Sequence, residues 1–252
     1  MRLLLLVLLP LAAFAGDNAC NLPADQGAGS LYSPFAKLPV NLVLDHEFYA
    51  KNRGRDAAAI TRAVATWNGW AVRRGFPAAF VIVEPRRGMD IPASDQCSQT
   101  YYTNAHQDMV GIWKISNEEG AHANERPTCG RNADGTTGHL LDANVRGQTD
   151  WLVGSEGKTK AASILLNFDD YNRAGKPVYD LESEALHELG HVLGLLHSCN
   201  GSSRGILDRT TAVACESAPQ AYKDAVMFPF LSDRELRTHL SQNDIDRINC
   251  LY

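Results

Sequence analysis

The spacing of three histidines in one short segment constrains this chain more than any other feature. Residues 187–197 have the pattern H-E-x-x-H-x-x-G-x-x-H. His187 and His191 are four residues apart, so in a helix their imidazoles lie on one face, one turn apart. Gly194 suits a left-handed residue that ends the helix, after which His197 can return to the same point. Three imidazoles with an open fourth position, and a carboxylate at Glu188 beside them, are typical of a catalytic zinc site.

The beginning of the chain has the composition of an export signal. Arg2 supplies a charged start, residues 3–11 are almost entirely apolar, and Ala13-Phe14-Ala15 has the small-residue spacing of a cleavage site. The apolar run is too short to span a bilayer, and no later segment is apolar enough to do so. We therefore expect residues 1–15 to be a signal peptide and the protein to be secreted, either extracellular or periplasmic, without a membrane span.

Charge and cysteine content further narrow the class of protein to which this chain can belong. The chain has 24 basic and 29 acidic residues, a net charge of -5, which argues against a nucleic-acid partner. Its cysteines number 6, and an even count in an exported chain indicates a disulfide framework whose connectivity the count does not reveal. The expected partner is a peptide or protein substrate, and we expect the chain to be a monomer.

Hydrophobic periodicity predicts one α+β domain over residues 37–252, preceded by an N-terminal segment, 16–36, that is a candidate short pro-segment or docking segment. Strands are expected at residues 38–44, 79–83, 110–115 and 161–168, and helices at 55–74, 181–195 and 240–251. Ser241 followed by Asp244 has the spacing of a capping box that starts the last helix. The turn-rich residues 116–150 are expected to form a long loop, which is uncommon unless it is functional or tied by a disulfide.

Several segments beside the zinc motif resemble the metzincins and, among them, the matrixins. Residues 180–186 lead into the motif as they do in matrixin active-site helices, and Ser198 follows the third histidine as the matrixin serine does. Residues 225–229, Ala-Val-Met-Phe-Pro, resemble the Met-turn. Residues 240–252 are similar to the matrixin C-terminal helix, and the similarity extends over most of residues 38–252.

The resemblance implies a metzincin, zincin-like fold: a twisted, mostly parallel sheet with two helices, and a smaller C-terminal subdomain that carries the Met-turn and the last helix. It implies that Met227 packs beneath the zinc-binding imidazoles without binding the metal. An extended substrate would pair with an edge strand, which we expect at residues 161–168. Matrixin-like specificity further implies an apolar residue on the carboxyl side of the cut, the P1′ position.

The chain departs from the matrixin pattern after the third histidine. About 30 residues separate His197 from Met227, far more than in a compact matrixin. Cys199 and Cys215 lie inside this insertion, and we expect them to bond to each other and close it as a flap beside the cleft. Leu231 stands where matrixins commonly have a tyrosine, two residues after the Met-turn proline.

The other cysteines suggest two further pairings. Cys97 is expected to pair with Cys129, and Cys20 could tether the N-terminus to Cys250 on the last helix. The same N-terminal segment could instead keep the enzyme latent by supplying a short inhibitory zinc ligand, for which the candidates are Asp17, Cys20 and Asp25.

Additional metal sites have weaker patterns. The family's structural zinc site is not recognisable, and His139 with Asp142 is at most a remnant of it. Asp169 and Asp170 could bind calcium, although a solvated turn is the simpler interpretation. One catalytic Zn²⁺ is therefore the expected cofactor, with Ca²⁺ as an open alternative.

Together the motifs predict a secreted zinc endopeptidase in which Glu188 acts as general base on a zinc-activated water. The alternative is a zinc-bearing peptide-binding module of the same fold that does not cut its ligand. A disulfide-stabilised inhibitor or toxin scaffold is a third interpretation. Glu188 and Gly194 favour the enzyme, because a protein without turnover has no need for the base or for the turn.

Overall fold

The structure is a computed structural model that describes residues 22, 31–50, 54–83, 109–115, 145–168, 172–173, 176–177, 179–201 and 213–252. The predicted signal peptide at residues 1–15 and the N-terminal residues 16–21 and 23–30 lie outside this part of the chain. No helix among the residues described is both long and apolar enough to cross a membrane.

The centre of the fold is a five-stranded sheet with the order β2-β1-β3-β5-β4. Four strands run parallel, and β4 alone pairs antiparallel, along β5. The strands are β1 Val40–Leu44, β2 Phe80–Ile82, β3 Val110–Ile115, β4 Gly147–Val153 and β5 Thr159–Asn167. The expectation of an α+β fold with a mostly parallel sheet is therefore confirmed.

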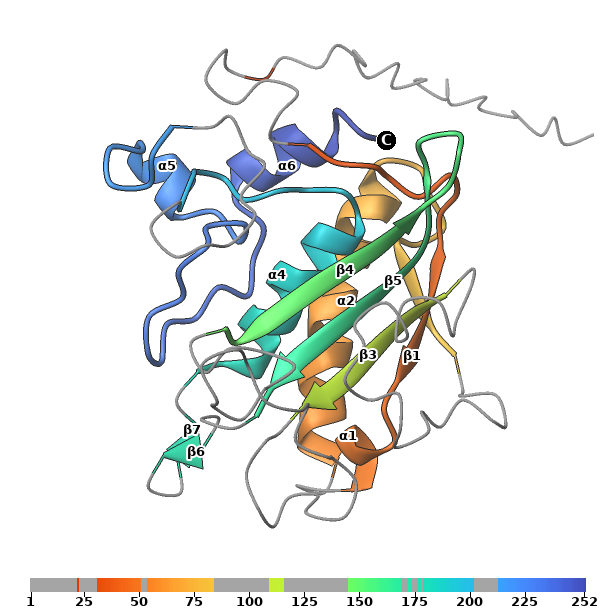
Figure 1. Ribbon diagram of the computed structural model, residues 1–252, viewed down its shortest axis with the longest axis vertical. Coiled ribbons are helices and arrows are strands. Elements are labelled where there is room, and N and C mark those ends of the chain that lie inside the picture. The colour runs from red at the N-terminus through yellow and green to blue at the C-terminus, as the bar shows by residue number, and fades with distance from the viewer. Residues whose placement is uncertain are drawn as a thin grey trace, which may run out of the picture.

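Two long helices, α2 (Arg55–Arg73) and α4 (Leu181–Val192), lie side by side against one face of this sheet (Figure 1). Shorter elements complete the described chain: α1 Glu47–Ala50, β6 Asn172–Arg173, β7 Lys176–Pro177, α5 Gln220–Lys223 and α6 Gln242–Ile248. Figure 1 shows α5 and α6 together at one end of the molecule, away from the central strands.

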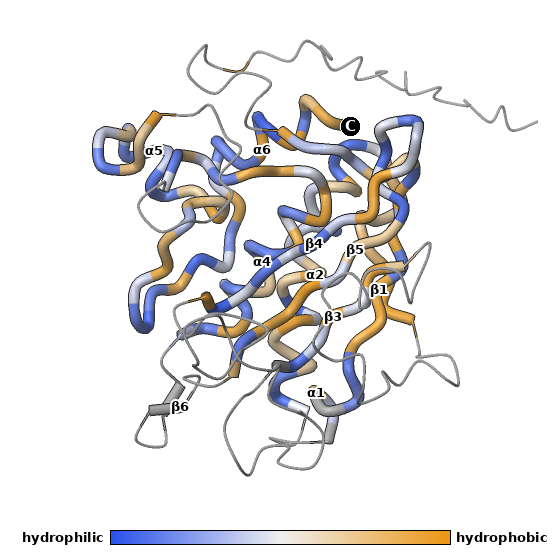
Figure 2. Tube along the Cα trace, in the orientation of Figure 1, coloured by the Kyte–Doolittle hydropathy of each residue, from blue (hydrophilic) through white to orange (hydrophobic). Residues whose placement is uncertain are grey.

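The packing between α2 and α4 follows from the apolar stripe on α2. Ile60, Ala63 and Trp67 recur at helical spacing and are fully buried. The Trp67 indole Nε1 donates to the carbonyl of Leu186 at 3.0 Å, so its one polar atom is satisfied inside the core. The apolar colouring of the inner strands in Figure 2 marks the other side of the same core, against which α4 is held.

Two expectations about the strands are wrong. The strand predicted at 161–168 lies in the interior of the sheet as part of β5, between β3 and β4, and is not an edge strand. The edge beside α4 is β4, whose first residues, 147–150, fall within the loop that we expected over residues 116–150. The loop prediction failed there because an edge strand keeps polar residues on its solvent side, so Gln148 and Asp150 gave it the composition of a loop.

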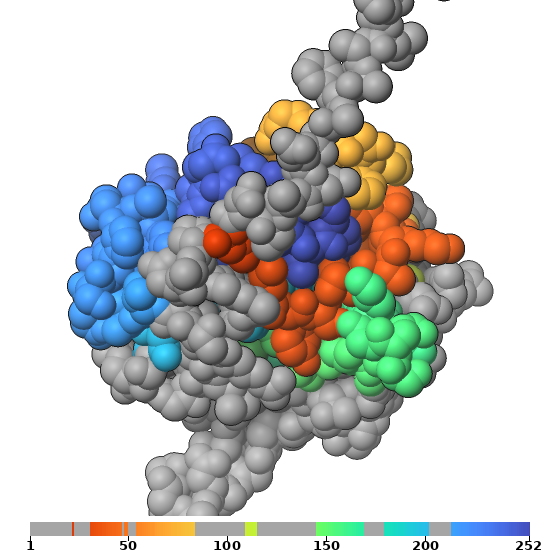
Figure 3. Space-filling view, turned by 90° about the horizontal axis from the view of Figure 1, so that it is seen from above, coloured from red at the N-terminus to blue at the C-terminus, as the bar shows by residue number. Residues whose placement is uncertain are grey.

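The segment at residues 31–35 is hydrogen-bonded to three distant parts of the chain. The Tyr32 amide donates to the Gly194 carbonyl at 2.7 Å, and the Thr159 amide donates to the Pro34 carbonyl at 3.0 Å. The Phe35 amide donates to the Tyr252 hydroxyl at 3.1 Å. In Figure 3 this segment, in red-orange, lies between the blue C-terminal residues and the green turn between β4 and β5.

Candidate metal centre

The helix α4 has a well-formed start. Asp180 is its N-cap, and the Asp180 carboxylate accepts from the Ser183 amide at 2.8 Å and from the Ser183 hydroxyl at 2.7 Å. These bonds satisfy a backbone donor that the first turn of a helix leaves without a partner. Ser183 Oγ also accepts from the Arg237 amide at 2.8 Å, so the same cap attaches the helix to the C-terminal residues.

The end of α4 turns the chain back toward the first two histidines. Gly194 has φ 98°, a left-handed conformation that a side chain would resist. Its amide donates to the His191 carbonyl at 2.9 Å, and the Leu195 amide donates to the Gly190 carbonyl at 3.0 Å. This pair of bonds forms a Schellman motif, after which the chain reverses and brings His197 alongside the helix.

The three histidines of the motif come together. One ring nitrogen from each of His187, His191 and His197 lies within 4.8 Å of the other two. His191 is buried, while His187 and His197 are partly exposed, so the cluster is open on one side. An open side is what a metal site needs if a substrate is to reach it.

The hydrogen bonds of the rings show which nitrogens could bind a metal. His187 Nδ1 lies 2.7 Å from the Val226 carbonyl, and His191 Nδ1 lies 2.7 Å from the Leu195 carbonyl. A carbonyl only accepts, so both Nδ1 atoms carry the hydrogen and both Nε2 atoms present lone pairs. These two Nε2 atoms are 3.1 Å apart, and lone pairs at that distance repel each other unless a cation lies beside them. The donor set therefore fits a divalent metal that prefers imidazole, as zinc does.

The electrostatics of the cluster favour neutral imidazoles. Burial of the rings lowers the pKa of His187 to about 3 and that of His191 well below its ordinary value. The neighbouring His197 and the cations of Arg237 and Arg247 lower the pKa of His187 further. A neutral imidazole is the form that binds a metal, so the lone pairs are available over the physiological pH range.

Glu188 lies beside the cluster against the edge strand. Thr149 Oγ1 of β4 donates to Glu188 Oε2 at 2.6 Å. A Cβ built on Gly147 would lie 2.6 Å from Glu188 Oε1 and 2.7 Å from Glu184 Oε1, so only glycine fits between these two carboxylates and the strand. Burial raises the pKa of Glu188, the nearby Glu184 raises it further, and the Thr149 hydrogen bond opposes both.

Met227 packs directly beneath α4. A Cβ built on Gly190 would overlap the Met227 sulfur, so the thioether occupies the space that this glycine leaves open. Both amides of the Val226–Met227 pair donate to the fully buried Asp244 carboxylate, at 2.9 Å and 3.1 Å. Because the Val226 carbonyl accepts from His187, Asp244 in the first turn of α6 holds the turn that orients the first histidine.

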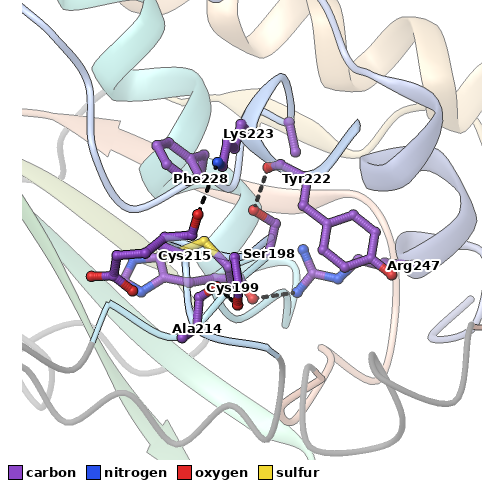
Figure 4. The surroundings of a disulfide bond; sticks show 12 residues. Ser198, Cys199, Ala214, Cys215, Tyr222, Lys223, Phe228 and Arg247 are labelled. Carbon is purple, nitrogen blue, oxygen red and sulfur yellow. Dashed lines mark hydrogen bonds between the residues drawn. A yellow bond between two sulfur atoms is a disulfide. The ribbon is translucent and has the colours of Figure 1, made fainter. Parts of the chain in front are cut away.

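A disulfide joins Cys199 and Cys215 next to the third histidine (Figure 4). The bridge closes the base of the insertion, where the Asn200 amide donates to the Val213 carbonyl and the Cys215 amide donates to the Asn200 carbonyl. Both cysteines are buried in a small cluster with Ala218 and Tyr222. Cys250 is also disulfide-bonded, and its partner lies outside the described residues.

The double variant Cys199→Ser/Cys215→Ser is expected to lose about 3 kcal/mol of free energy of unfolding. The bridge spans 16 residues of sequence, and removing a cross-link of this length restores conformational entropy to the unfolded chain. Denaturant unfolding of the variant and the wild type measures the difference. Equal unfolding midpoints with equal slopes would contradict this prediction.

Several predicted sites lie outside the described residues, namely Asp17, Cys20, Asp25, Cys97, Cys129, His139, Asp142, Asp169 and Asp170. The pairings Cys97–Cys129 and Cys20–Cys250 therefore remain predictions. Sequence reasoning missed Thr149, Trp151 and Arg247, which contact the motif from distant parts of the chain. None of the three had a usable periodic signal, because residues 149–153 read Thr-Asp-Trp-Leu-Val and do not alternate between polar and apolar side chains.

The chain is similar to plant metalloendoproteinases. It is 30% identical over 138 residues to Metalloendoproteinase 5-MMP of Arabidopsis thaliana, a match that covers 53% of this chain and 29% of the relative. It is 32% identical over 93 residues to Metalloendoproteinase 4-MMP of the same plant, covering 37% of this chain and 20% of the relative. Metalloendoproteinase 1 of Glycine max is 35% identical over 74 residues, with 29% of this chain and 17% of the relative covered.

These matches confirm the resemblance to matrixin-like metalloendoproteinases that the motifs indicated. The matched part spans less than a third of the length of each of these relatives. A comparison with models of known protein families found none that matches the chain.

Proposed function

We propose that this chain is an exported zinc endopeptidase that cuts extended peptides. The observation that carries the proposal is the convergence of three imidazoles with their metal-binding nitrogens facing one another, with Glu188 one residue along the same helix. The similarity to metalloendoproteinases supports the same activity. Zinc held by His187, His191 and His197 would supply a Lewis acid and a water of near-neutral pKa.

In this proposal Glu188 is the general base. Its raised pKa suits a group that takes a proton from water and passes it to the leaving amine of the peptide. The Thr149 hydrogen bond fixes one carboxylate oxygen and leaves the other to exchange the proton. Gly147 permits this arrangement because it brings no side chain between β4 and the helix.

The substrate is proposed to bind along β4. Within the described part of the chain β4 pairs on one side only, with β5, so its outer edge can accept an extended peptide by strand addition. The Arg146 guanidinium donates to the Leu231 carbonyl at 2.6 Å, which places the segment after the Met-turn against the start of β4. Phe230, 40% exposed, and Leu231 supply apolar surface there, which supports a preference for an apolar P1′ residue.

Removing the metal from the purified chain is expected to abolish peptide cleavage, and adding back stoichiometric zinc is expected to restore it. The experiment measures zinc content and the cleavage of a mixed peptide library before chelation, after it and after reconstitution. The cut sites report the P1′ preference. A chain that binds zinc but cuts no peptide, even after its N-terminus is trimmed, would favour the peptide-binding module instead.

A further inference from the structure

Arg247 is a buried cation that contacts the turn carrying the third histidine. It lies on α6, its side chain is fully buried, and its NH2 donates to the Leu196 carbonyl at 2.5 Å and to the His197 carbonyl at 3.1 Å. Figure 4 shows its guanidinium reaching from α6 toward this turn, beside the ring of Tyr222. The backbone of the third histidine is thus bonded to a helix that begins 45 residues later in the chain, at Gln242.

The Schellman turn alone does not fix His197. Its two hydrogen bonds end at Gly194 and Leu195, so the next residues need other partners to hold the third ring at the cluster. On the far side, the Ser198 amide donates to the Met227 carbonyl at 2.8 Å, and the Ser198 hydroxyl donates to the Tyr222 carbonyl at 2.7 Å. The hydrogen bonds of Arg247, to the carbonyls of residues 196 and 197, lie along the chain between these two sets of bonds.

A buried guanidinium is costly, so a purely space-filling role would be served better by an apolar side chain. Burial lowers the pKa of Arg247 to about 10, and the Asp244 carboxylate and the Tyr222 side chain oppose this shift. The side chain therefore stays charged at physiological pH and donates strong hydrogen bonds to the two carbonyls. The Asp244 carboxylate of α6 also accepts from the amides of Val226 and Met227. Helix α6 therefore contacts the backbone segments that hold the first and the third histidine in place.

We propose that Arg247 is a positioning residue for the metal centre, which holds His197 in place through the carbonyls of Leu196 and His197. This inference rests on the proposed zinc site, but it concerns the retention of the metal rather than the cutting of peptides. Groups that orient metal ligands in this way typically change metal affinity by about 10- to 100-fold when they are removed.

The test measures zinc affinity by chelator competition for the wild type, Arg247→Met and Arg247→Lys. The absorption spectrum of the Co²⁺-substituted proteins reports the geometry of the ligand set. We expect Arg247→Met to lower zinc affinity by about 10- to 100-fold and to alter the Co²⁺ spectrum, because His197 loses its anchor. Arg247→Lys keeps the charge, but its side chain ends one bond short of the guanidinium nitrogens. We therefore expect its zinc affinity to lie between those of the wild type and Arg247→Met.

Arg74→Met is the matched control. Arg74 NH2 donates to the Tyr252 carbonyl at 3.4 Å, so this variant loses an arginine bond at the C-terminal residues rather than at the turn of His197. We expect its affinity and spectrum to equal those of the wild type, with all measurements made at a temperature where circular dichroism shows each protein folded.

Wild-type affinity and an unchanged Co²⁺ spectrum in folded Arg247→Met would overturn the inference. If Arg247→Met does not fold, wild-type affinity in Arg247→Lys overturns it, and reduced affinity in Arg247→Lys supports it. A wild-type chain that binds no zinc overturns both this inference and the proposed function. A wild-type chain that binds zinc and cuts nothing removes the proposed function alone, because the affinities still decide the role of Arg247.

Discussion

The Glu188→Gln variant is expected to keep its zinc and to lose turnover by about 10²- to 10⁴-fold, the typical contribution of a general base. Glutamine has nearly the same shape, and its amide oxygen can still accept the bond from Thr149 Oγ1, so the packing against β4 is preserved. It cannot take a proton from water at neutral pH, which removes the proposed chemical step. Peptide cleavage rates and zinc content, measured on the same preparation, test both halves of the prediction.

Glu184 provides the control for Glu188. It lies one helical turn earlier, is buried like Glu188, and faces the same point at Gly147. Its pKa is raised by burial, against the opposing influence of Arg146. Glu184→Gln therefore makes the same chemical change in the same environment, and we expect it to reduce turnover far less. Equal losses in the two variants would mean that burial of the carboxylates, rather than proton transfer by Glu188, limits the activity.

The Gly190→Ala variant is expected to lose about 2 kcal/mol of free energy of unfolding, the range observed when a packed core is overfilled. Alanine normally stabilises a helix interior relative to glycine by roughly 1 kcal/mol. The change in stability expected here therefore has the opposite sign to the change that helix propensity alone predicts. The reason is that the new methyl group would overlap the Met227 sulfur beneath α4. Because Met227 and Val226 support the imidazoles, we also expect the variant to bind zinc less tightly.

Gly69→Ala in α2 is the corresponding control. A methyl group there would meet Arg73 NH1 at 3.6 Å, an ordinary van der Waals contact. We expect this variant to be more stable than the wild type by about 0.5 to 1 kcal/mol and to bind zinc normally. Denaturant unfolding of both variants tests the contrast. If both were stabilised to the same extent, the close packing of Met227 against Gly190 would be refuted.

The parts of the site that the sequence predicts are those encoded locally. His187, His191 and Gly194 belong to one helix and its end, where spacing along the chain determines spacing in three dimensions. The capping box of α6 at Ser241 and Asp244 could be recognised for the same reason, and the structure forms it. Strand β3 has the predicted bounds of 110–115, because its ends coincide with clear changes in composition.

The parts that the sequence does not predict depend on long-range pairing. Thr149 and Glu188 are 39 residues apart, and Arg247 follows His197 by 50 residues, so no periodicity connects them. The interior position of β5 had a signal that we misread. A continuous apolar run such as residues 161–166, broken only by Ser163, is typical of a strand buried on both faces, whereas an edge strand alternates.

The late position of α6 in the chain has a consequence for the timing of synthesis. The third histidine leaves the ribosome well before the helix that holds its carbonyl, since 50 residues separate His197 from Arg247. The amides of Val226 and Met227 likewise gain their acceptor only with Asp244, which follows Met227 by 17 residues. A nascent chain that has exposed the whole H-E-x-x-H-x-x-G-x-x-H segment therefore still lacks the supports of two of its histidines. The proposed metal centre can therefore acquire its full set of supports only after α6 has been synthesised.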